Sequence, residues 1–215
     1  MDTLRVEIID ATRVQEALAL VAFVFNNYEP VLSALVPPEV KLGEEIFFEM
    51  KESVIQDGLS TIIIDTQTDK VVGVRLSCSS KDDTGPPPID CERFPQCKGF
   101  ISAWAHIHAL WEKDRSNDVT KSELAYWIAL AVHPDFGGRG IGQKLYEENI
   151  KLLKSKGFKG AYAICTSAFS SSAAEKIGAK KISFQKYATW EQDGAYPLSS
   201  IKPPHVEICI REVNF

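Results

Sequence analysis

Hydrophobic residues recur along this chain with two spacings, one typical of helices and one typical of strands. Apolar side chains at every third or fourth position favour helices, and the segments concerned are 11–27, 30–35, 43–56, 100–111, 140–156 and 170–177. Alternating or continuous apolar runs favour strands, and they cover 4–10, 59–65, 71–77, 124–132, 160–165, 181–190 and 206–213. The run LAYWIALAV at 124–132 is apolar throughout, which predicts a strand in the middle of a sheet.

The order of these elements predicts an α/β fold. The turn TQTDK joins 59–65 to 71–77 as an antiparallel hairpin. The strand–helix–strand order over 124–165 predicts one β–α–β unit. Residues 79–99 are rich in Pro, Asp, Ser and Lys without any period, so they predict a long loop of the kind that forms lids or binding loops. A length of 215 residues is enough for one large domain or two small ones.

Composition narrows the class of protein. With 45% hydrophobic and 25% charged residues, the chain is typical of globular proteins, which excludes a disordered or fibrous one. A formal charge of −5 argues against nucleic acid as a partner, because such binders need a basic face. The N-terminus lacks the layout of a signal peptide, and the apolar run 17–25 is too short to cross a bilayer. We therefore expect no nucleic acid, no membrane and a cytoplasmic location.

The cysteines are odd in number and scattered, as expected for thiols in a reducing compartment. They are Cys78, Cys91, Cys97, Cys165 and Cys209. Only Cys91 and Cys97 lie close together, in CERFPQC, where a pair of loop thiols is favoured over a local disulfide or a metal clip. No Cys and His cluster has the spacing of a zinc site, so we expect no metal.

Charge is distributed unevenly along the chain. Residues 130–181 hold nine basic and four acidic side chains, a net charge of +5, so the remainder carries −10. The basic segment suits an anion, and the acidic remainder suits a cation.

The most informative segment is LAVHPDFGGRGIGQKL, which starts within the apolar strand 124–132. Gly138, Gly140 and Gly142 lead into a helix, where glycines let backbone amides approach and hold an anion such as phosphate. The spacing fits neither a dinucleotide fingerprint nor a P-loop, because Gln143 stands where both need glycine. A glycine-rich helix start that serves turn geometry alone is the alternative.

This segment resembles the pyrophosphate loop of the GNAT superfamily of N-acetyltransferases, written Gln/Arg-x-x-Gly-x-Gly/Ala. Gly140 and Gly142 match its two small positions, whereas Gly137 stands where the family has Gln or Arg. Arg139 could supply part of the missing charge. The resemblance implies that acetyl-CoA is the co-substrate. The residues that it assigns to cofactor binding are Leu130, Ala131, Val132, Gly137, Gly138, Arg139, Gly140, Ile141 and Gly142.

The resemblance extends over the whole chain. NNYEPVLSAL, CTSAFSSSAAEKIGAKK and KPPHVEICIREV look like segments of the invertebrate arylalkylamine N-acetyltransferases, although Tyr28 stands where relatives often have an acid. The family implies a single domain over 1–215, with a mixed central β-sheet flanked by helices on both faces. It also implies an acetyl-CoA-binding core at about 122–181.

Transfer of an acetyl group to a primary amine requires a base. Such an amine has a pKa of about 10, so it can attack a thioester only after its proton has been accepted. Glu29 is the candidate, because it follows an apolar helix and burial beside Pro30 would raise its pKa. The alternative is that Glu29 only charges the first turn of the helix at Pro30.

The thiolate of CoA must gain a proton as it leaves. The resemblance assigns this assistance to Ser170, and Thr166 is a second hydroxyl four residues earlier. The alternative for Ser170 is the N-cap of the helix at 170–177. Tyr162 and Tyr187 are fallback donors, with core packing as their alternative.

Other side chains are candidates for the border of the acceptor site. His205 matches the Pro-His pair of the family, and a loop hydrogen bond is its alternative role. The aromatic side chains of Tyr28, Phe47 and Trp104 could line a slot for the amine, or belong to the core.

Together these observations predict an acetyl-CoA-dependent N-acetyltransferase that acts on a small arylalkylamine by direct attack with general-base assistance. One alternative is the same chemistry on a polyamine, an amino acid or a protein amine. Another is a weakly catalytic CoA-binding protein, suggested by Gly137. The preferred amine, the length of the acyl group and the oligomeric state do not follow from the sequence, and a monomer is compatible with it.

Overall fold

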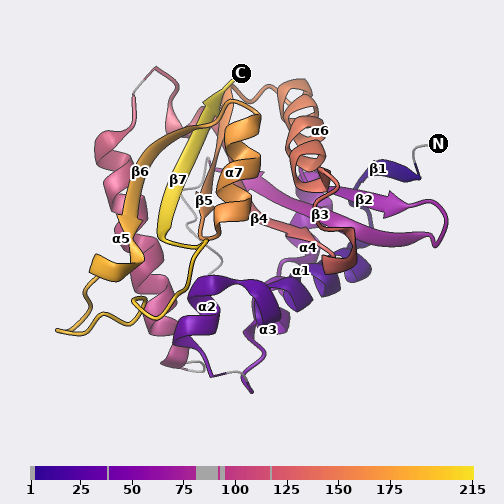
Figure 1. Ribbon diagram of the computed structural model, residues 1–215. Helices are drawn as coiled ribbons and strands as arrows, with labels where there is room; N and C mark the ends of the chain where they lie inside the picture. Colours follow the sequence, from indigo (N-terminus) through magenta and orange to yellow (C-terminus); the bar gives the residue numbers. More distant parts are fainter. Residues whose placement is uncertain (1–2, 38, 81–91, 93–94, 117) are drawn as a thin grey trace.

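A mixed β-sheet forms the centre of the molecule (Figure 1). The computed structural model describes residues 3–37, 39–80, 92, 95–116 and 118–215. Within these ranges the seven strands follow the order β1-β2-β3-β4-β5-β7-β6, and only β4 and β5 pair in parallel. Their bounds are β1 Leu4–Ile8, β2 Thr61–Asp65, β3 Lys70–Ser79, β4 Leu124–Val132, β5 Gly160–Cys165, β6 Lys180–Lys186 and β7 Glu207–Asn214. The predicted mixed sheet is confirmed.

Helices cover both faces of this sheet, as predicted (Figure 1). The helices α1, α3 and α4 pack on one face over β2, β3 and β4, and α2 and α5 cover the part of that face formed by β4, β5 and β7. The helices α6 and α7 cover the opposite face. Their bounds are α1 Val14–Tyr28, α2 Pro30–Leu35, α3 Leu42–Phe48, α4 Lys51–Asp57, α5 Lys98–Asp114, α6 Ile141–Ser155 and α7 Ala168–Lys176. Within the described ranges, no helix is both long enough and apolar enough to span a membrane.

The central strand β4 contains a bulge at Ile128. Consecutive residues of β3 pair with Trp127 and Ala129, so Ile128 is the extra residue between them. A bulge shifts the alternation of side chains along a strand. Trp127 and Leu130 therefore both face α6, although an unbroken alternation would place them on opposite faces of the sheet.

Beyond the bulge, β4 separates from β5. Their parallel pairing begins with Leu124 beside Gly160 and ends with Trp127 beside Ala163. Both strands continue past that pair, β4 against β3 and β5 against β7. The sheet is therefore open between the carboxyl-terminal halves of these two strands, which is the edge where ligands bind in open α/β sheets.

One predicted helix is wrong, because 43–56 forms two helices, α3 and α4. The Met50 N–H donates to Phe47 O at 3.1 Å, which is a tighter turn than the α-helix has. The change of direction lets Phe47 of α3 and Val54 of α4 both bury their side chains in the core formed with α1. Tertiary packing, and not local propensity, accounts for the break.

The predicted loop 79–99 is shorter at both ends, because β3 extends to Ser79 and α5 already begins at Lys98. Residues 81–91 and 93–94 lie outside the described residues, and with them the predicted lid and the partner of Cys97 in the CERFPQC pair. Cys97 itself is buried at the end of a short 3-10 turn.

The strand predicted over 181–190 ends at Lys186 and is followed by a 3-10 turn. The side chain of Tyr187 is buried, and its hydroxyl donates a hydrogen bond to the carbonyl of Thr166, the residue that follows β5. The strand thus ends where Tyr187 turns into the core, which is the packing that the sequence offers as its alternative role.

Asn149 fastens α6 to the sheet. Its Oδ1 accepts hydrogen bonds from Trp127 Nε1 at 2.8 Å and Ser77 Oγ at 3.0 Å, and its Nδ2 donates to Leu59 O at 2.8 Å. Asn149 has no exposed surface, so water cannot replace these bonds. One side chain therefore joins α6 to β3, to β4 and to the segment that leads into β2.

We expect Asn149→Ala to lower the free energy of unfolding by about 3 kcal/mol, because three buried groups lose their partner at once. Urea unfolding should show a lower midpoint at an unchanged slope. Asn27→Ala is the control, because Asn27 is exposed and makes one bond to Phe23 O, so it should change stability by less than about 0.5 kcal/mol. Equal losses in the two variants would contradict the role of Asn149.

Candidate active site

A groove of about 560 Å³ lies between the start of α6 and α7. It follows the end of β4 and the glycine-rich turn, and His205 lies on its border. Seven of the residues predicted to bind the cofactor line it, namely Leu130, Val132, Gly137, Gly138, Gly140, Ile141 and Gly142. The groove thus brings together most of the segment that the sequence singles out.

The start of α6 has the geometry of an anion site. Gly138 and Gly140 have φ angles of 72° and 75°, which favour glycine, and Gly140 is the N-cap of the helix. The first amides of a helix have no partner within it, and the helix dipole adds positive charge there. Lys176 of α7 lines the same groove and contributes a full positive charge.

Two predicted cofactor residues lie away from the groove surface. The side chain of Ala131 is buried in the core on the α1 face. Arg139 donates from Nη2 to Asp135 O at 3.2 Å, and its guanidinium lies 4.8 Å from the ring centre of Phe136. Neither is among the residues that line the groove, so a role for Ala131 would rest on its backbone.

A smaller cavity of about 80 Å³ lies in the gap between β4 and β5. It shares Leu130 and Ser170 with the groove on one side. On the other side it shares Glu29, Ile128 and Thr166 with a third cavity. The gap between the strands therefore lies between the groove and that third cavity.

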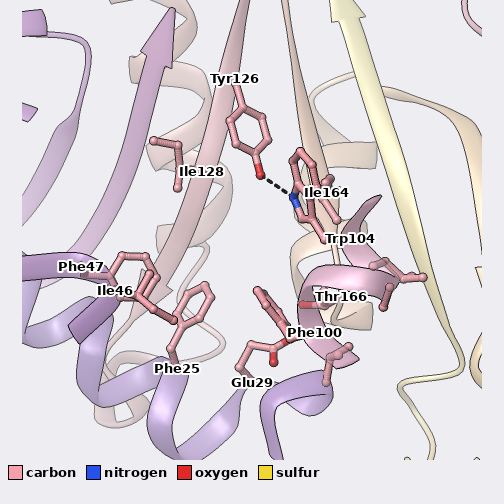
Figure 2. A pocket seen from close by; sticks show the side chains of 13 residues that line it. Phe25, Glu29, Ile46, Phe47, Phe100, Trp104, Tyr126, Ile128, Ile164 and Thr166 are labelled. Atoms are coloured by element: carbon pink, nitrogen blue, oxygen red, sulfur yellow. Dashed lines mark hydrogen bonds between the residues drawn. The ribbon is translucent and has the colours of Figure 1, made fainter. Parts of the chain in front are cut away.

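The third cavity is an apolar chamber of about 70 Å³ (Figure 2). Figure 2 shows Glu29 and Phe100 at one end and Tyr126 at the other, where Trp104 Nε1 donates to the Tyr126 hydroxyl at 3.2 Å. Phe47 and Trp104 line this chamber, as the sequence suggests. Tyr28, by contrast, is 55% exposed and borders the groove and the gap.

Among the described residues that line the chamber, Glu29 is the one that is charged. Its Oε2 accepts the Leu32 N–H, so Glu29 is the N-cap of α2 and lies at the helix start where the sequence places it. Its Oε1 is buried and has no hydrogen-bond partner among the described residues. Burial raises the pKa of Glu29 above its ordinary value, while the Leu32 amide and the Thr166 hydroxyl oppose the shift.

Ser167, and not Ser170, is the N-cap of α7, so that alternative for Ser170 is wrong. The Ser167 Oγ accepts the Ser170 N–H at 3.1 Å. The Ser170 hydroxyl donates to Ser167 O at 3.0 Å, and its residue borders both the groove and the gap. The helix starts earlier than predicted, because only Thr166 separates the end of β5 from the N-cap Ser167.

His205 forms the loop hydrogen bond that was one of its two predicted roles. Its Nδ1 accepts the Ala168 N–H at 3.1 Å, which ties the segment before β7 to the first turn of α7. Burial lowers the pKa of His205 from its ordinary value. A neutral imidazole that accepts this bond fits that direction.

Sequence reasoning missed two residues that line the gap, Arg75 and Tyr146. Arg75 stands alone in the apolar run VVGVRLSC, and a charged residue inside a buried strand was a signal that could have been used. Tyr146 falls within the apolar stripe of α6, where nothing in the sequence separates it from its neighbours.

Comparison with known families gives one match. The model of the acetyltransferase (GNAT) family matches residues 43–175. A search among curated proteins found no match to this sequence.

Solved structures with the same fold include several acetyltransferases. Arylalkylamine N-acetyltransferase 2 from Aedes aegypti is 19% identical, with a TM-score of 0.77 and 99% of each chain covered. Polyamine N-acetyltransferase from Drosophila melanogaster, which forms N-acetylagmatine, is 17% identical, with a TM-score of 0.67 over 99% of this chain and 100% of that one. A phosphinothricin acetyltransferase from Sinorhizobium meliloti in complex with acetyl-CoA is 13% identical, with a TM-score of 0.58 over 99% and 89%. At these identities the likeness shows a shared fold.

The raised pKa of Glu29 predicts a pH-dependent stability. The folded chain binds this proton more tightly than the unfolded chain, so the stability from Glu29 is complete below the ordinary value of 4.5 and is lost as the pH rises through the raised pKa. Glu29→Gln keeps the shape of the neutral carboxyl and should abolish this decline. Urea unfolding is measured in pH steps from about 4.5 to 8. The free energy of unfolding of the variant, relative to that of the wild type, should rise with pH over this range. Parallel curves would contradict the shift.

Proposed function

This chain belongs to the acetyltransferase (GNAT) family, and from that premise we propose that it transfers the acetyl group of acetyl-CoA to the primary amine of a small arylalkylamine. The observation that carries the choice of acceptor is the chamber beside Glu29. Its described lining is apolar and aromatic and contains a single carboxylate. An aromatic monoamine matches that lining, because its ring is apolar and its one cation meets one acid.

The groove supports acetyl-CoA as the second substrate. A Cβ added to Gly138 or Gly140 would meet no heavy atom within 4 Å, so the turn is open towards the groove. We assign the pyrophosphate to the amides at the start of α6 and to Lys176, and the pantetheine arm to the end of β4. At Gly137 an added Cβ would lie 3.1 Å from Pro134 O, so a longer side chain such as the Gln or Arg of the family pattern would need this turn to shift slightly.

The proposed reaction is a direct transfer in the gap between β4 and β5. The ammonium of the acceptor gives a proton to Glu29, whose raised pKa makes it a stronger base than an exposed carboxylate. The free amine then attacks the carbonyl carbon of the thioester. The hydroxyls of Thr166 and Ser170 line the gap, and we propose that they assist the departing sulfur.

A panel of acceptors tests the proposal. With acetyl-CoA, we expect kcat/KM for tyramine, dopamine or phenethylamine to exceed that for spermidine by at least about tenfold, because the described residues of the apolar chamber offer no second carboxylate to a second ammonium. The measurement is thiol release as a function of amine concentration. A preference for spermidine would overturn the assignment of a monoamine, and no thiol release with any amine would overturn the transferase.

Glu29→Gln separates catalysis from binding. We expect kcat/KM to fall by about 10²- to 10⁴-fold, the usual range for loss of a general base. Affinity for acetyl-CoA should remain within about twofold, because Glu29 does not border the groove at α6. The measurements are steady-state kinetics and calorimetric titration with acetyl-CoA. A wild-type rate that is already negligible, with affinity retained, would instead support the weakly catalytic CoA-binding protein.

A further inference from the structure

Arg75 is a buried cation without an anionic partner. It lies on β3 with 1% of its surface exposed, and no ion pair joins it to a carboxylate in the described part of the chain. Its Nε and Nη2 atoms are also buried without a hydrogen-bond acceptor among the described residues. Buried charges are normally paired, so an unpaired guanidinium calls for a physical reason.

Two aromatic rings hold this guanidinium in place. Its central carbon lies 4.1 Å from the ring centre of Tyr146 on α6 and 4.9 Å from that of Trp127 on β4. Asn149 fixes the Trp127 ring through the 2.8 Å bond to its Nε1. Cation–π contacts offset part of the desolvation of the guanidinium without neutralising its charge.

The held cation faces the gap between β4 and β5. Arg75, Trp127 and Tyr146 line the cavity there together with Ser170 and Thr166. This cavity lies between the groove and the apolar chamber, which share residues with it on its two sides. A group passing from one to the other therefore comes next to an uncompensated positive charge.

We propose that Arg75 stabilises the negative charge that develops on the CoA sulfur as the acetyl group leaves. The inference rests on the proposed acetyl transfer. In that step the amine nitrogen forms a bond to the carbonyl carbon, the carbon–sulfur bond breaks, and its electron pair stays on the sulfur. The proton lost by the amine passes to Glu29 and from there to water.

An unpaired cation suits this task because it interacts with the transition state more than with the ground state. The thioester is neutral, whereas the departing sulfur is anionic, so attraction to Arg75 grows along the reaction. Burial strengthens that attraction, because little water screens it. A carboxylate beside Arg75 would cancel the effect.

The titratable groups around Arg75 leave its charge uncompensated. They are Tyr146 on α6, Cys165 on β5 and Tyr126 on β4, and Glu29, which lines the same cavity, forms no ion pair with Arg75 in the described part of the chain. Burial raises the pKa of both phenols, and the hydrogen bond with Cys209 together with burial raises that of Cys165, so all three are neutral near pH 7. Burial lowers the pKa of Arg75 itself, yet a guanidinium remains protonated at this pH.

The test measures the pKa of the CoA thiol when it is bound to the protein. Thiolate absorbance in the ultraviolet is recorded against pH, with the same protein saturated with desulfo-CoA as the reference, which subtracts the protein's own thiols. We expect the bound thiol pKa of the wild type to lie at least about one unit below that of Arg75→Met, with Arg75→Lys in between. The rate of acetyl transfer should fall at least about tenfold in Arg75→Met.

Arg115→Met is the matched control. The side chain of Arg115 is also largely buried, with its guanidinium 4.8 Å from the ring centre of Trp111, but it pairs with Glu212 at 3.7 Å and is not among the residues that line the gap. This variant should lose stability and keep the wild-type thiol pKa. Arg75→Met should keep or gain stability, because an unpaired buried charge is replaced by an apolar chain of similar length.

Each outcome decides between the proposals. A thiol pKa that is equal in the wild type and Arg75→Met would overturn the role of Arg75 and leave the proposed transferase intact. A lowered thiol pKa without turnover of any amine would support the stabilisation of the sulfur and overturn the transferase. If the wild type does not bind CoA, both proposals are wrong. A shift in the Arg115→Met control as large as in Arg75→Met would also overturn the specific role of Arg75.

Discussion

β4 and β5 pair in parallel as far as Trp127 and Ala163 and then separate, and the three cavities of the candidate site lie along this gap. Because of this separation, the second half of β4 has no strand partner among the described residues on the side that faces β5. Buried peptide N–H and C=O groups normally have hydrogen-bond partners, so this side of β4 can accept a ligand. The bulge at Ile128 falls at the same place and turns the following side chains to new faces. The gap therefore offers both space and backbone hydrogen-bonding groups, which is what an extended, polar ligand arm would need.

Several residues around the gap serve the fold and the site at the same time. Glu29 caps α2 with one carboxylate oxygen, which fixes the other oxygen beside the chamber. His205 holds the first turn of α7, and Ser170 lies within that turn next to the groove. Capping and chemistry are therefore compatible for Glu29, because a cap orients a side chain as firmly as a catalytic site requires.

Local signals in the sequence are enough to predict much of this architecture, and packing decides the rest. The segments 124–132 and 160–165 match β4 and β5, because continuous apolar runs between turns are read without tertiary information. The break between α3 and α4 depends on how two short helices fit against α1, and no local residue marks it. The N-cap of α7 is one of several neighbouring serines, and only the end of β5 selects Ser167. The glycine turn is visible in the sequence because its strand, glycines and helix are consecutive, whereas the chamber combines side chains from α1, α2, α3, α5, β4, β5 and β7 that only the fold brings together.

Arg75 shows that the free-energy cost and the electrostatic effect of a charged side chain depend on its burial in the fold. In sequence it is one charge in an apolar strand, and an exposed strand end would accommodate it at little free-energy cost. In the fold it lies on β3 beside the central strand β4 and beneath α6, where an apolar side chain would pack without desolvating a charge. Trp127 and Tyr146 bracket it, and the buried bond from Asn149 keeps one of these rings in position. The contacts that fasten α6 to the sheet therefore also hold a cation at the gap. The free-energy cost of burying this charge is the counterpart of having it where the strands separate.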